Sequence, residues 1–529
     1  MITVRLSPDK KWLYTRCSTP EETTWLASYF IVKVPNWQML QKKYPGIQTE
    51  QAFINDIGMI PVGLWAYLVN LCQRTGACLV FEEGFEQAMF NMSVSQQDFK
   101  NYVEYLFSKS DITPMPYQVE SAYNLIKYRT CCAEISTSGG KTLMAYVLFR
   151  FFIDYLKLKH ILYVTPATEL TTQSYNKFRM YDKDNQMPDN WTGACIFAKA
   201  KKKKVYDDTI VFGNYQSLHR KDPSFFEKYD AVIIDEAHHS KADSILKILS
   251  RCTNAVYKIG MTGTFPADGS FESFVVQSNI GPVVYRLTSF ELINKHNFAT
   301  PVYVTAINLK YLSLSEQDEI QKALREKDKD DVDEGGRIFN HEKKLVWNNP
   351  TRFDYICNMI AGTTKNSLVI YGDVQNGYGK RVYERLKQTT KKDVFFIEGS
   401  TDAKVRNIYK EAMENDATGN TIIVSSMGCF TEGIDIANLW NIFLIESTKS
   451  DNTLAQLLGR GMRRYPKKDK TRFIDIVDDF RSGVKGSIDN YLFTHGKKRQ
   501  KIYTSRGFPL QVFDVDIRPL PKAKNIIDE

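Results

Sequence analysis

The chain has 529 residues, and its composition of 43% hydrophobic and 25% charged residues excludes a mostly disordered, collagen-like or coiled-coil protein. At about 150 residues per domain, this length suggests three or four domains. Lys and Arg number 70 against 61 Asp and Glu, and the resulting formal net charge of +9 favours a polyanionic partner.

The longest membrane-like stretch is residues 57–73, which contains Pro61 and Asn70. It falls short of the roughly 20 apolar residues that a membrane span needs, so we expect a buried helix and no membrane association. The first residues contain no apolar signal core. The nine cysteines are scattered without a C-x-x-C pair, which indicates reduced thiols and argues against zinc. These features predict a cytoplasmic protein, in the host cytoplasm if the source is a virus.

Four regions follow one another along the chain. Residues 1–104 predict a small α+β domain, and residues 483–529 predict a basic C-terminal extension. In residues 105–298, and again in 299–482, short apolar strands alternate with helical segments. This alternation is typical of a parallel sheet with helices on both faces, so we expect two tandem α/β domains. The expected strands are residues 130–136, 161–165, 209–212, 231–235 and 255–261, then 367–371, 394–397, 421–425, 442–445 and 473–477.

A glycine-rich loop, STSGGKT, joins the strand at 130–136 to a helix expected at 142–156. Backbone N–H groups in such a loop, together with the helix N-terminus, bind phosphates. We expect Lys141 to contact the β- and γ-phosphates and the Thr142 hydroxyl to ligate Mg²⁺. The alternative is an ordinary Gly-rich turn, because Ile135 replaces the usual first glycine. The residues of this loop expected to bind ATP are Ser138, Gly139, Gly140, Lys141 and Thr142.

Two adjacent carboxylates end the apolar strand at 231–235, in the sequence DEAH. Asp235 is placed to hold Mg²⁺, and Glu236 to orient and deprotonate the attacking water. His238 is a candidate for coupling this site to its neighbours. The alternative is a solvated acidic turn, which the preceding phosphate loop makes the weaker interpretation.

Arg460 and Arg463 lie in the helical sequence QLLGRGMR of the second α/β domain. Their spacing of three places them on one face of a helix. Such arginines stabilise the γ-phosphate during transfer and are worth about 10³–10⁵ in rate. The alternative is a pair of surface arginines.

In this order, the motifs resemble those of superfamily 2 helicases, which implies two RecA-like domains with ATP and Mg²⁺ as cofactors. Motif III departs from the common Ser-Ala-Thr, since this chain has Thr262-Gly263-Thr264. The resemblance implies that Tyr117 and Gln118 contact the adenine, and that Gly433, Asp435 and Gln456 contact other parts of the nucleotide. It implies coupling roles for His238, Thr262 and Thr264. The residues implied to contact nucleic acid are Pro166, Ala167, Thr168, Gln216, Ser217 and Thr431.

Three further segments are similar to the bacteriophage UvsW-type recombination helicases: residues 402–410, 490–496 and 60–64. This resemblance implies an enzyme that unwinds or branch-migrates forks, Holliday junctions and R-loops, with an N-terminal domain that helps to bind DNA. We therefore expect an ATP-dependent DNA helicase that acts on single-stranded and branched DNA, largely independently of sequence. We expect a monomer, with single-strand-binding or recombination proteins as candidate partners.

Two alternatives share these motor motifs: an RNA helicase and a restriction-type translocase on double-stranded DNA. An alternative of another class is an annealing or binding protein with a non-productive ATP site. The intact Lys141, Asp235, Glu236, Arg460 and Arg463 argue against that last interpretation.

Three basic runs predict phosphate contacts. They are Lys199 with residues 201–204, then Arg463, Arg464, Lys467, Lys468 and Lys470, and finally Lys497, Lys498, Arg499 and Lys501. We expect deletion of the residues after Asp489 to remove the third set of contacts and to spare the ATP site. The alternative for each run is a solvated surface.

Overall fold

A computed structural model describes residues 1–44, 46–197, 206–238, 243–311, 314–327, 334–429, 436–481 and 487–517. The chain forms two compact units, Met1–Leu287 and Thr288–Glu529. The lysine run at 199–204 and the motif V residues Thr431, Gly433 and Asp435 lie outside the described residues.

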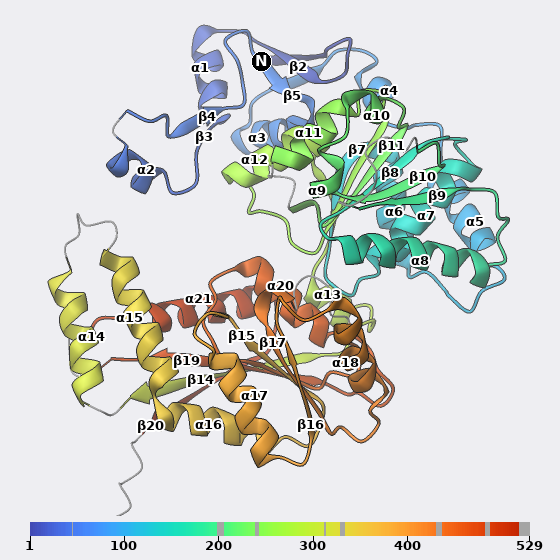
Figure 1. The fold of residues 1–529 in the computed structure, drawn as a ribbon. Helices are drawn as coiled ribbons and strands as arrows, with labels where there is room; N and C mark the ends of the chain where they lie inside the picture. Colours follow the sequence, from blue (N-terminus) through green and yellow to red (C-terminus); the bar gives the residue numbers. More distant parts are fainter. Residues whose placement is uncertain are drawn as a thin grey trace, which may run out of the picture. The chain divides into compact units, whose positions relative to one another are not determined.

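Unit 1 begins with a small mixed sheet whose strand order is β5-β2-β1-β6 (Figure 1). Its core packs on a helix of the following domain, since Phe274 lies in one apolar cluster with Phe30 and Phe53. The predicted helix at 57–73 starts later, because a strand and a 3₁₀ turn precede it. The elements are β1 (Ile2–Leu6), β2 (Trp12–Cys17), α1 (Pro20–Ser28), β3 (Ile31–Lys33), α2 (Trp37–Lys43), β4 (Glu50–Ala52), β5 (Met59–Pro61), η1 (Val62–Leu64), α3 (Trp65–Thr75), β6 (Leu79–Phe81), α4 (Phe85–Met89) and α5 (Gln96–Leu106).

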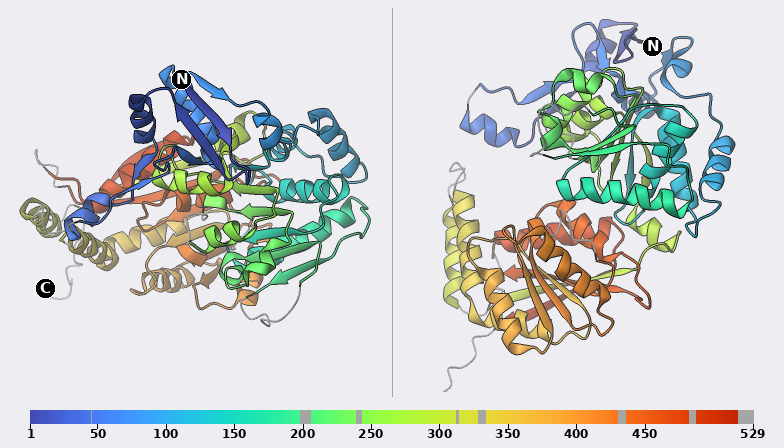
Figure 2. Two further views of the ribbon diagram at one scale, coloured as in Figure 1. Left: turned by 90° about the horizontal axis from the view of Figure 1, so that it is seen from above. Right: turned by 45° about the vertical axis from the view of Figure 1, so that its right-hand side comes forward.

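The rest of unit 1 is a seven-stranded, all-parallel sheet with helices on both faces (Figures 1 and 2). In order across the sheet, its strands are β13 (Val283–Leu287), β7 (Thr130–Ile135), β12 (Tyr257–Thr262), β11 (Ala231–Asp235), β8 (Ile161–Thr165), β10 (Ile210–Asn214) and β9 (Gly193–Ile196). Its helices are α6 (Pro116–Tyr128), α7 (Lys141–Asp154), α8 (Thr168–Asp184), α9 (Tyr215–Leu218), α10 (Pro223–Glu227), α11 (Asp243–Arg251) and α12 (Phe271–Ile280).

Side-chain alternation along the strands explains the two helical layers. Tyr163 and Phe212 pack against Phe178 of α8. Their neighbours Leu162 and Val211 belong to a separate cluster on the other face, with residues of α11 and α12. Because both faces are apolar, each strand reads as a continuous hydrophobic run.

Unit 2 contains a second all-parallel sheet of seven strands. The two tandem parallel sheets confirm the predicted fold class. In order across the sheet, the strands are β16 (Asp393–Ile397), β17 (Thr421–Ser426), β15 (Ser367–Tyr371), β18 (Asn441–Leu444), β19 (Thr471–Asp479), β14 (Val302–Tyr311) and β20 (Leu510–Ile517). The helices are α13 (Ser289–Asn294), α14 (Leu314–Glu326), α15 (Glu334–Asn348), α16 (Pro350–Ala361), α17 (Tyr378–Thr389), α18 (Ala403–Asn415), α20 (Asp451–Gly461) and α21 (Tyr491–Ser505).

The C-terminal segment differs from the predicted extension. Strand β20 pairs with β14 and forms one edge of the sheet. Helix α21 lies directly on β19, since a Cβ at Gly496 would stand 2.3 Å from Val477 Cγ1. Arg499 is fully buried and bonds the equally buried Asp475 at 2.9 Å. Its prediction as a phosphate contact is therefore wrong, whereas Lys497, Lys498 and Lys501 are exposed.

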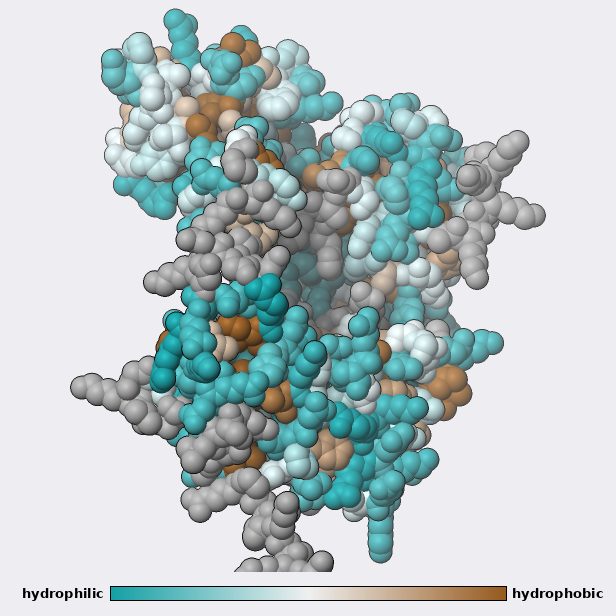
Figure 3. Space-filling view, turned by 60° about the vertical axis from the view of Figure 1, so that its left-hand side comes forward, coloured by the Kyte–Doolittle hydropathy of each residue, from teal (hydrophilic) through white to brown (hydrophobic). Residues whose placement is uncertain are grey.

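The face shown in Figure 3 is mostly hydrophilic, with apolar residues in small separate patches. Among the described residues, no helix has the length and apolar character needed to cross a bilayer.

Candidate ATP-binding and hydrolysis site

Parallel strands place the loops after β7, β12 and β11 at one edge of the first sheet. Strand β12 lies between β7 and β11, so the loop that follows it lies between the phosphate loop and the DEAH sequence. Open α/β sheets bind ligands at this carboxyl edge.

The phosphate loop has a backbone that turns sharply. Ser138 and Gly140 adopt positive φ values of 71° and 81°. The positive φ favours glycine at position 140, and a Cβ there would stand 2.1 Å from Gln118 Nε2 and displace that side chain. Helix α7 starts at Lys141, so the loop leads directly into the N-terminus of this helix.

Tyr117 and Gln118 lie against this loop. The Tyr117 hydroxyl and Gln118 Nε2 both donate to the carbonyl of Gly139 at 3.1 Å. Gln118 Oε1 also accepts from the Met115 N–H at 2.9 Å. The side chain of Gln118 therefore links the start of α6 to the phosphate loop, and the adenine contact stays a prediction.

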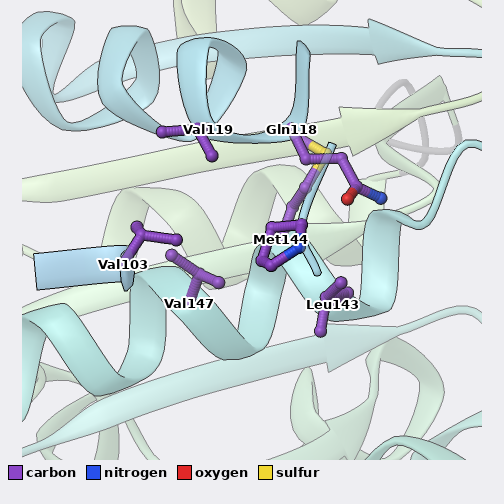
Figure 4. A pocket seen from close by; sticks show the side chains of 7 residues that line it. Val103, Gln118, Val119, Leu143, Met144 and Val147 are labelled. Atoms are coloured by element: carbon purple, nitrogen blue, oxygen red, sulfur yellow. The ribbon is translucent and has the colours of Figure 1, made fainter. Parts of the chain in front are cut away.

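A narrow apolar hollow, too small to admit a water molecule, adjoins Gln118. In Figure 4, Gln118 lies at one end and Val103 and Val147 at the other, with Met144 between them. Aliphatic side chains therefore lie beside the side-chain amide of Gln118.

A chain of polar contacts joins the three loops. Lys141 Nζ lies 3.2 Å from Glu236 Oε1, and His238 Nδ1 lies 3.3 Å from Glu236 Oε2. His238 Nδ1 is also 2.8 Å from the Thr262 hydroxyl, which donates to the Thr264 carbonyl at 2.7 Å. The structure thus brings together Lys141, Glu236, His238, Thr262 and Thr264.

The two carboxylates titrate in opposite directions. Burial and the neighbouring charge of Glu236 raise the pKa of Asp235 above its usual range. Burial opposes ionisation of Glu236 as well, but the charge of Lys141 and the hydrogen bond with His238 outweigh it and lower the pKa of Glu236. Glu236 is thus held as a carboxylate, as a general base requires.

The donor set around Asp235 fits Mg²⁺. No group of three or more His, Cys, Asp or Glu side chains suited to a metal occurs in the described ranges. Asp235 and Thr142 would supply two oxygen ligands, and phosphates and water the others, which matches the preference of Mg²⁺ for few protein ligands. Gly263 lies close to the phosphate loop, because a Cβ there would stand 3.0 Å from Thr137 Oγ1 and 3.3 Å from Lys141 Nζ.

The predicted nucleic-acid residues lie at the same edge, after β8 and β10. Pro166, Ala167 and Thr168 lead into α8, and Gln216 and Ser217 lie in α9. Thr168 and Gln216 are exposed, whereas the side chain of Ser217 is buried.

Asn214 is a residue that the sequence interpretation missed. Its Nδ2 donates to Thr168 Oγ1 at 2.8 Å, and its Oδ1 accepts from the Ser217 N–H at 2.9 Å. It therefore ties the two predicted nucleic-acid motifs together. Its position directly before a helix, where Asn is a preferred N-cap, was the available signal.

In unit 2, Gln456 and Arg460 lie in α20, and Arg463 lies just beyond its last residue, Gly461. Arg463 N–H still donates to the Arg460 carbonyl at 3.4 Å. The helix therefore ends before Arg463, whereas the spacing predicted both arginines within one helix.

Two tandem parallel sheets, with a phosphate loop and a DEAH sequence at the edge of the first, define a P-loop, ATP-hydrolysing enzyme with RecA-like domains. A family model described as "Type III restriction enzyme, res subunit" matches residues 111–267. The ATP-dependent DNA helicase uvsW of Enterobacteria phage T4 is 25% identical over 476 residues, 85% of this chain and 87% of that protein. The resemblance to UvsW-type helicases is thereby confirmed.

Solved structures share the fold. The Type ISP restriction-modification enzyme LlaBIII bound to DNA matches 84% of this chain and 34% of its own, with a TM-score of 0.53 and 17% identity. Dbp5 of S. cerevisiae bound to RNA and ADP BeF3 matches 78% of this chain and 93% of its own, with a TM-score of 0.52 and 13% identity.

Proposed function

We propose that this protein is an ATP-dependent DNA helicase or translocase that remodels branched DNA such as forks, Holliday junctions and R-loops. The observation that carries the motor assignment is the 3.2 Å contact between Lys141 and Glu236 beside Asp235. The DNA assignment is supported by the likeness to the T4 helicase, which extends well beyond the 157 residues (111–267) of the matched family model.

In the proposed reaction, Lys141 binds the β- and γ-phosphates, and the N–H groups of the phosphate loop surround them. Glu236 then exchanges its contact with Lys141 for the attacking water and accepts its proton. When bound at Thr142 and Asp235, Mg²⁺ neutralises charge on the phosphates. Arg460 and Arg463 are proposed to stabilise the charge that develops on the γ-phosphate.

We propose that Pro166, Ala167, Thr168 and Gln216 contact the phosphates of a DNA strand. Contacts of this kind position the strand but carry no base information, so binding is largely independent of sequence. Ser217 and the motif V residue Thr431 complete the proposed set. We further propose a cytoplasmic monomer whose partners are single-strand-binding or recombination proteins, and whose residues 1–104 assist DNA binding.

Two related motors provide the alternatives. The family model is named for a restriction enzyme, and Dbp5 was solved with RNA. An unwinding panel of fork, Holliday junction, R-loop, linear duplex and RNA duplex tests the substrate. Preference for the branched DNA substrates supports the proposal, and unwinding confined to RNA overturns it.

Glu236→Gln is expected to keep ATP binding but to slow hydrolysis about 10²–10⁴-fold, because the water loses its base while Asp235 and Lys141 remain. Nucleotide affinity and steady-state turnover with single-stranded DNA measure the two effects. Glu227→Gln, an exposed glutamate of the same unit, is the control. Parallel loss of binding and hydrolysis would show that Glu236 builds the site and is not its base.

Thr262→Val is expected to lower DNA-stimulated turnover about tenfold and to leave the basal rate nearly unchanged. The substitution removes the hydroxyl that joins His238 to the loop after β12, at a cost of about 1–3 kcal/mol of hydrogen bonding. ATPase rates titrated with single-stranded DNA give both values. An equal loss in the basal and stimulated rates contradicts a coupling role.

A further inference from the structure

The end of helix α20 is held by donors from three other segments. The last carbonyls of a helix have no partner within it, and they require donors from elsewhere. The Gly461 carbonyl accepts from Thr471 Oγ1 at 2.7 Å and from Lys468 Nζ at 3.0 Å. The Met462 carbonyl accepts from the Thr300 N–H at 2.8 Å. The Arg463 carbonyl accepts from Thr300 Oγ1 and Lys468 Nζ, each at 3.0 Å.

Lys468 makes two of these contacts, so its ammonium faces the backbone and not the open surface that its predicted phosphate contact requires. Its ammonium has three N–H donors and meets three backbone carbonyls, those of Gly461, Arg463 and, at 3.2 Å, Ala437. A cation at this place also interacts favourably with the helix dipole. The preceding residue, Lys467, is exposed and has a φ of 65°, which reverses the chain after α20 and turns Lys468 back toward the helix end.

The ammonium group of Lys468 lies in a buried environment that also contains Glu414 and Arg463. Burial lowers the pKa of Lys468 to about 7, with Glu414 opposing the shift and Arg463 adding to it. Glu414 Oε2 accepts from the N–H groups of Ala437 and Asn438 at 2.7 and 3.2 Å. Burial of the Lys468 ammonium is unfavourable by itself, so its hydrogen bonds to the backbone carbonyls are needed to stabilise it in this position.

Thr300 brings a different part of the chain to the same point. It is 4% exposed and lies between α13 and β14, in the segment by which the chain enters unit 2. Its N–H and hydroxyl contact two successive carbonyls, those of Met462 and Arg463. The backbone of Arg463 is therefore tied to the entry segment of its unit.

We propose that Lys468 and Thr300 are positioning residues that fix the backbone of Arg463 where it leaves α20, an inference that rests on the proposed role of Arg463 in hydrolysis. The guanidinium of Arg463 reaches a reacting phosphate only from a defined starting point, and a misplacement of about 1 Å can reduce a rate about 10²-fold. Thr300 makes the position of Arg463 follow that of the entry segment, and Lys468 ties Arg463 to Gly461 and Ala437.

The test is a set of single-turnover hydrolysis measurements with enzyme in excess, so that slow rates remain measurable. Lys468→Met is expected to lower the rate about 10–100-fold at saturating single-stranded DNA, with ATP affinity unchanged. Lys391→Met removes the same charge from an exposed lysine elsewhere in unit 2 and is expected to keep the wild-type rate. Thr300→Val loses one hydroxyl and is expected to lower the rate about threefold to tenfold.

The decisive arm repeats these substitutions in the Arg463→Ala background. If Lys468 and Thr300 act through Arg463, neither substitution lowers the rate further once that side chain is gone. An equal loss in both backgrounds, or a wild-type rate for Lys468→Met and Thr300→Val, overturns the proposal. A wild-type rate for Arg463→Ala alone would instead refute the proposed role of Arg463. Thr300→Val keeps the test available if Lys468→Met does not fold.

Discussion

Lys141→Ala is expected to abolish measurable ATP turnover, with a loss of at least about 10²–10³-fold, because no other side chain of the loop supplies a cation to the phosphates. The structure adds a second effect. Lys141 lies 3.2 Å from Glu236 and lowers its pKa, so the substitution also removes the ion pair of Glu236 and raises the pKa of that carboxylate. Steady-state ATP hydrolysis with saturating single-stranded DNA gives the measurement.

The control for this variant is Lys247→Ala, which removes an exposed lysine of α11 in the same unit. Both variants are expected to bind single-stranded DNA without nucleotide, because the proposed strand contacts follow β8 and β10. Turnover close to that of the wild type in a folded Lys141→Ala protein would refute the phosphate-loop assignment.

Arg499→Met is expected to lower the free energy of unfolding of unit 2 by about 3–5 kcal/mol, since it leaves the buried Asp475 without its cation. The Tyr503 hydroxyl at 3.0 Å is a neutral partner and does not replace it. Arg499 Nη1 also donates to the Thr448 carbonyl at 3.1 Å, just before α20, so local order at that helix should fall too. Denaturant unfolding followed by tryptophan fluorescence, to which Trp347 and Trp440 of unit 2 contribute, measures the change.

Two comparisons make this prediction specific. Lys498→Met removes the neighbouring exposed charge and should change stability by less than about 0.5 kcal/mol. Asp475→Leu combined with Arg499→Met replaces both partners by apolar groups and should recover much of the loss. If Arg499→Met unfolds like the wild type, the pair contributes nothing to unit 2.

Deleting the residues after Asp489 should have a larger effect than either point variant. It removes β20 from the sheet, and it removes the three donors that Asn490, Tyr491 and Leu492 direct to the buried Glu342. We therefore expect insoluble or unfolded unit 2, in place of the intact ATP site that the sequence alone predicted for this truncation.

The sequence by itself determined the class of fold and the chemistry of the first domain. The strands at 161–165, 231–235 and 367–371 were predicted with their exact bounds, because continuous apolar runs flanked by polar turns have few other interpretations. The phosphate loop and the DEAH sequence are local motifs, since each depends on neighbouring residues along one strand and one turn.

Only the tertiary structure decided which distant residues meet. The order of strands in the sheet brings β12 between β7 and β11, and this order sets the contact of His238 with Thr262. The tertiary structure also separated one arginine from three lysines of a single basic run. Arg499 falls on the face of α21 that carries Leu492, Gly496 and Tyr503, at helical spacing, and that face lies against β19. The charged side chain of Arg499 can be buried there because it forms an ion pair with Asp475 of β19. These two residues lie more than 20 positions apart in the sequence, so their contact depends on the packing of α21 against the sheet and not on the local sequence.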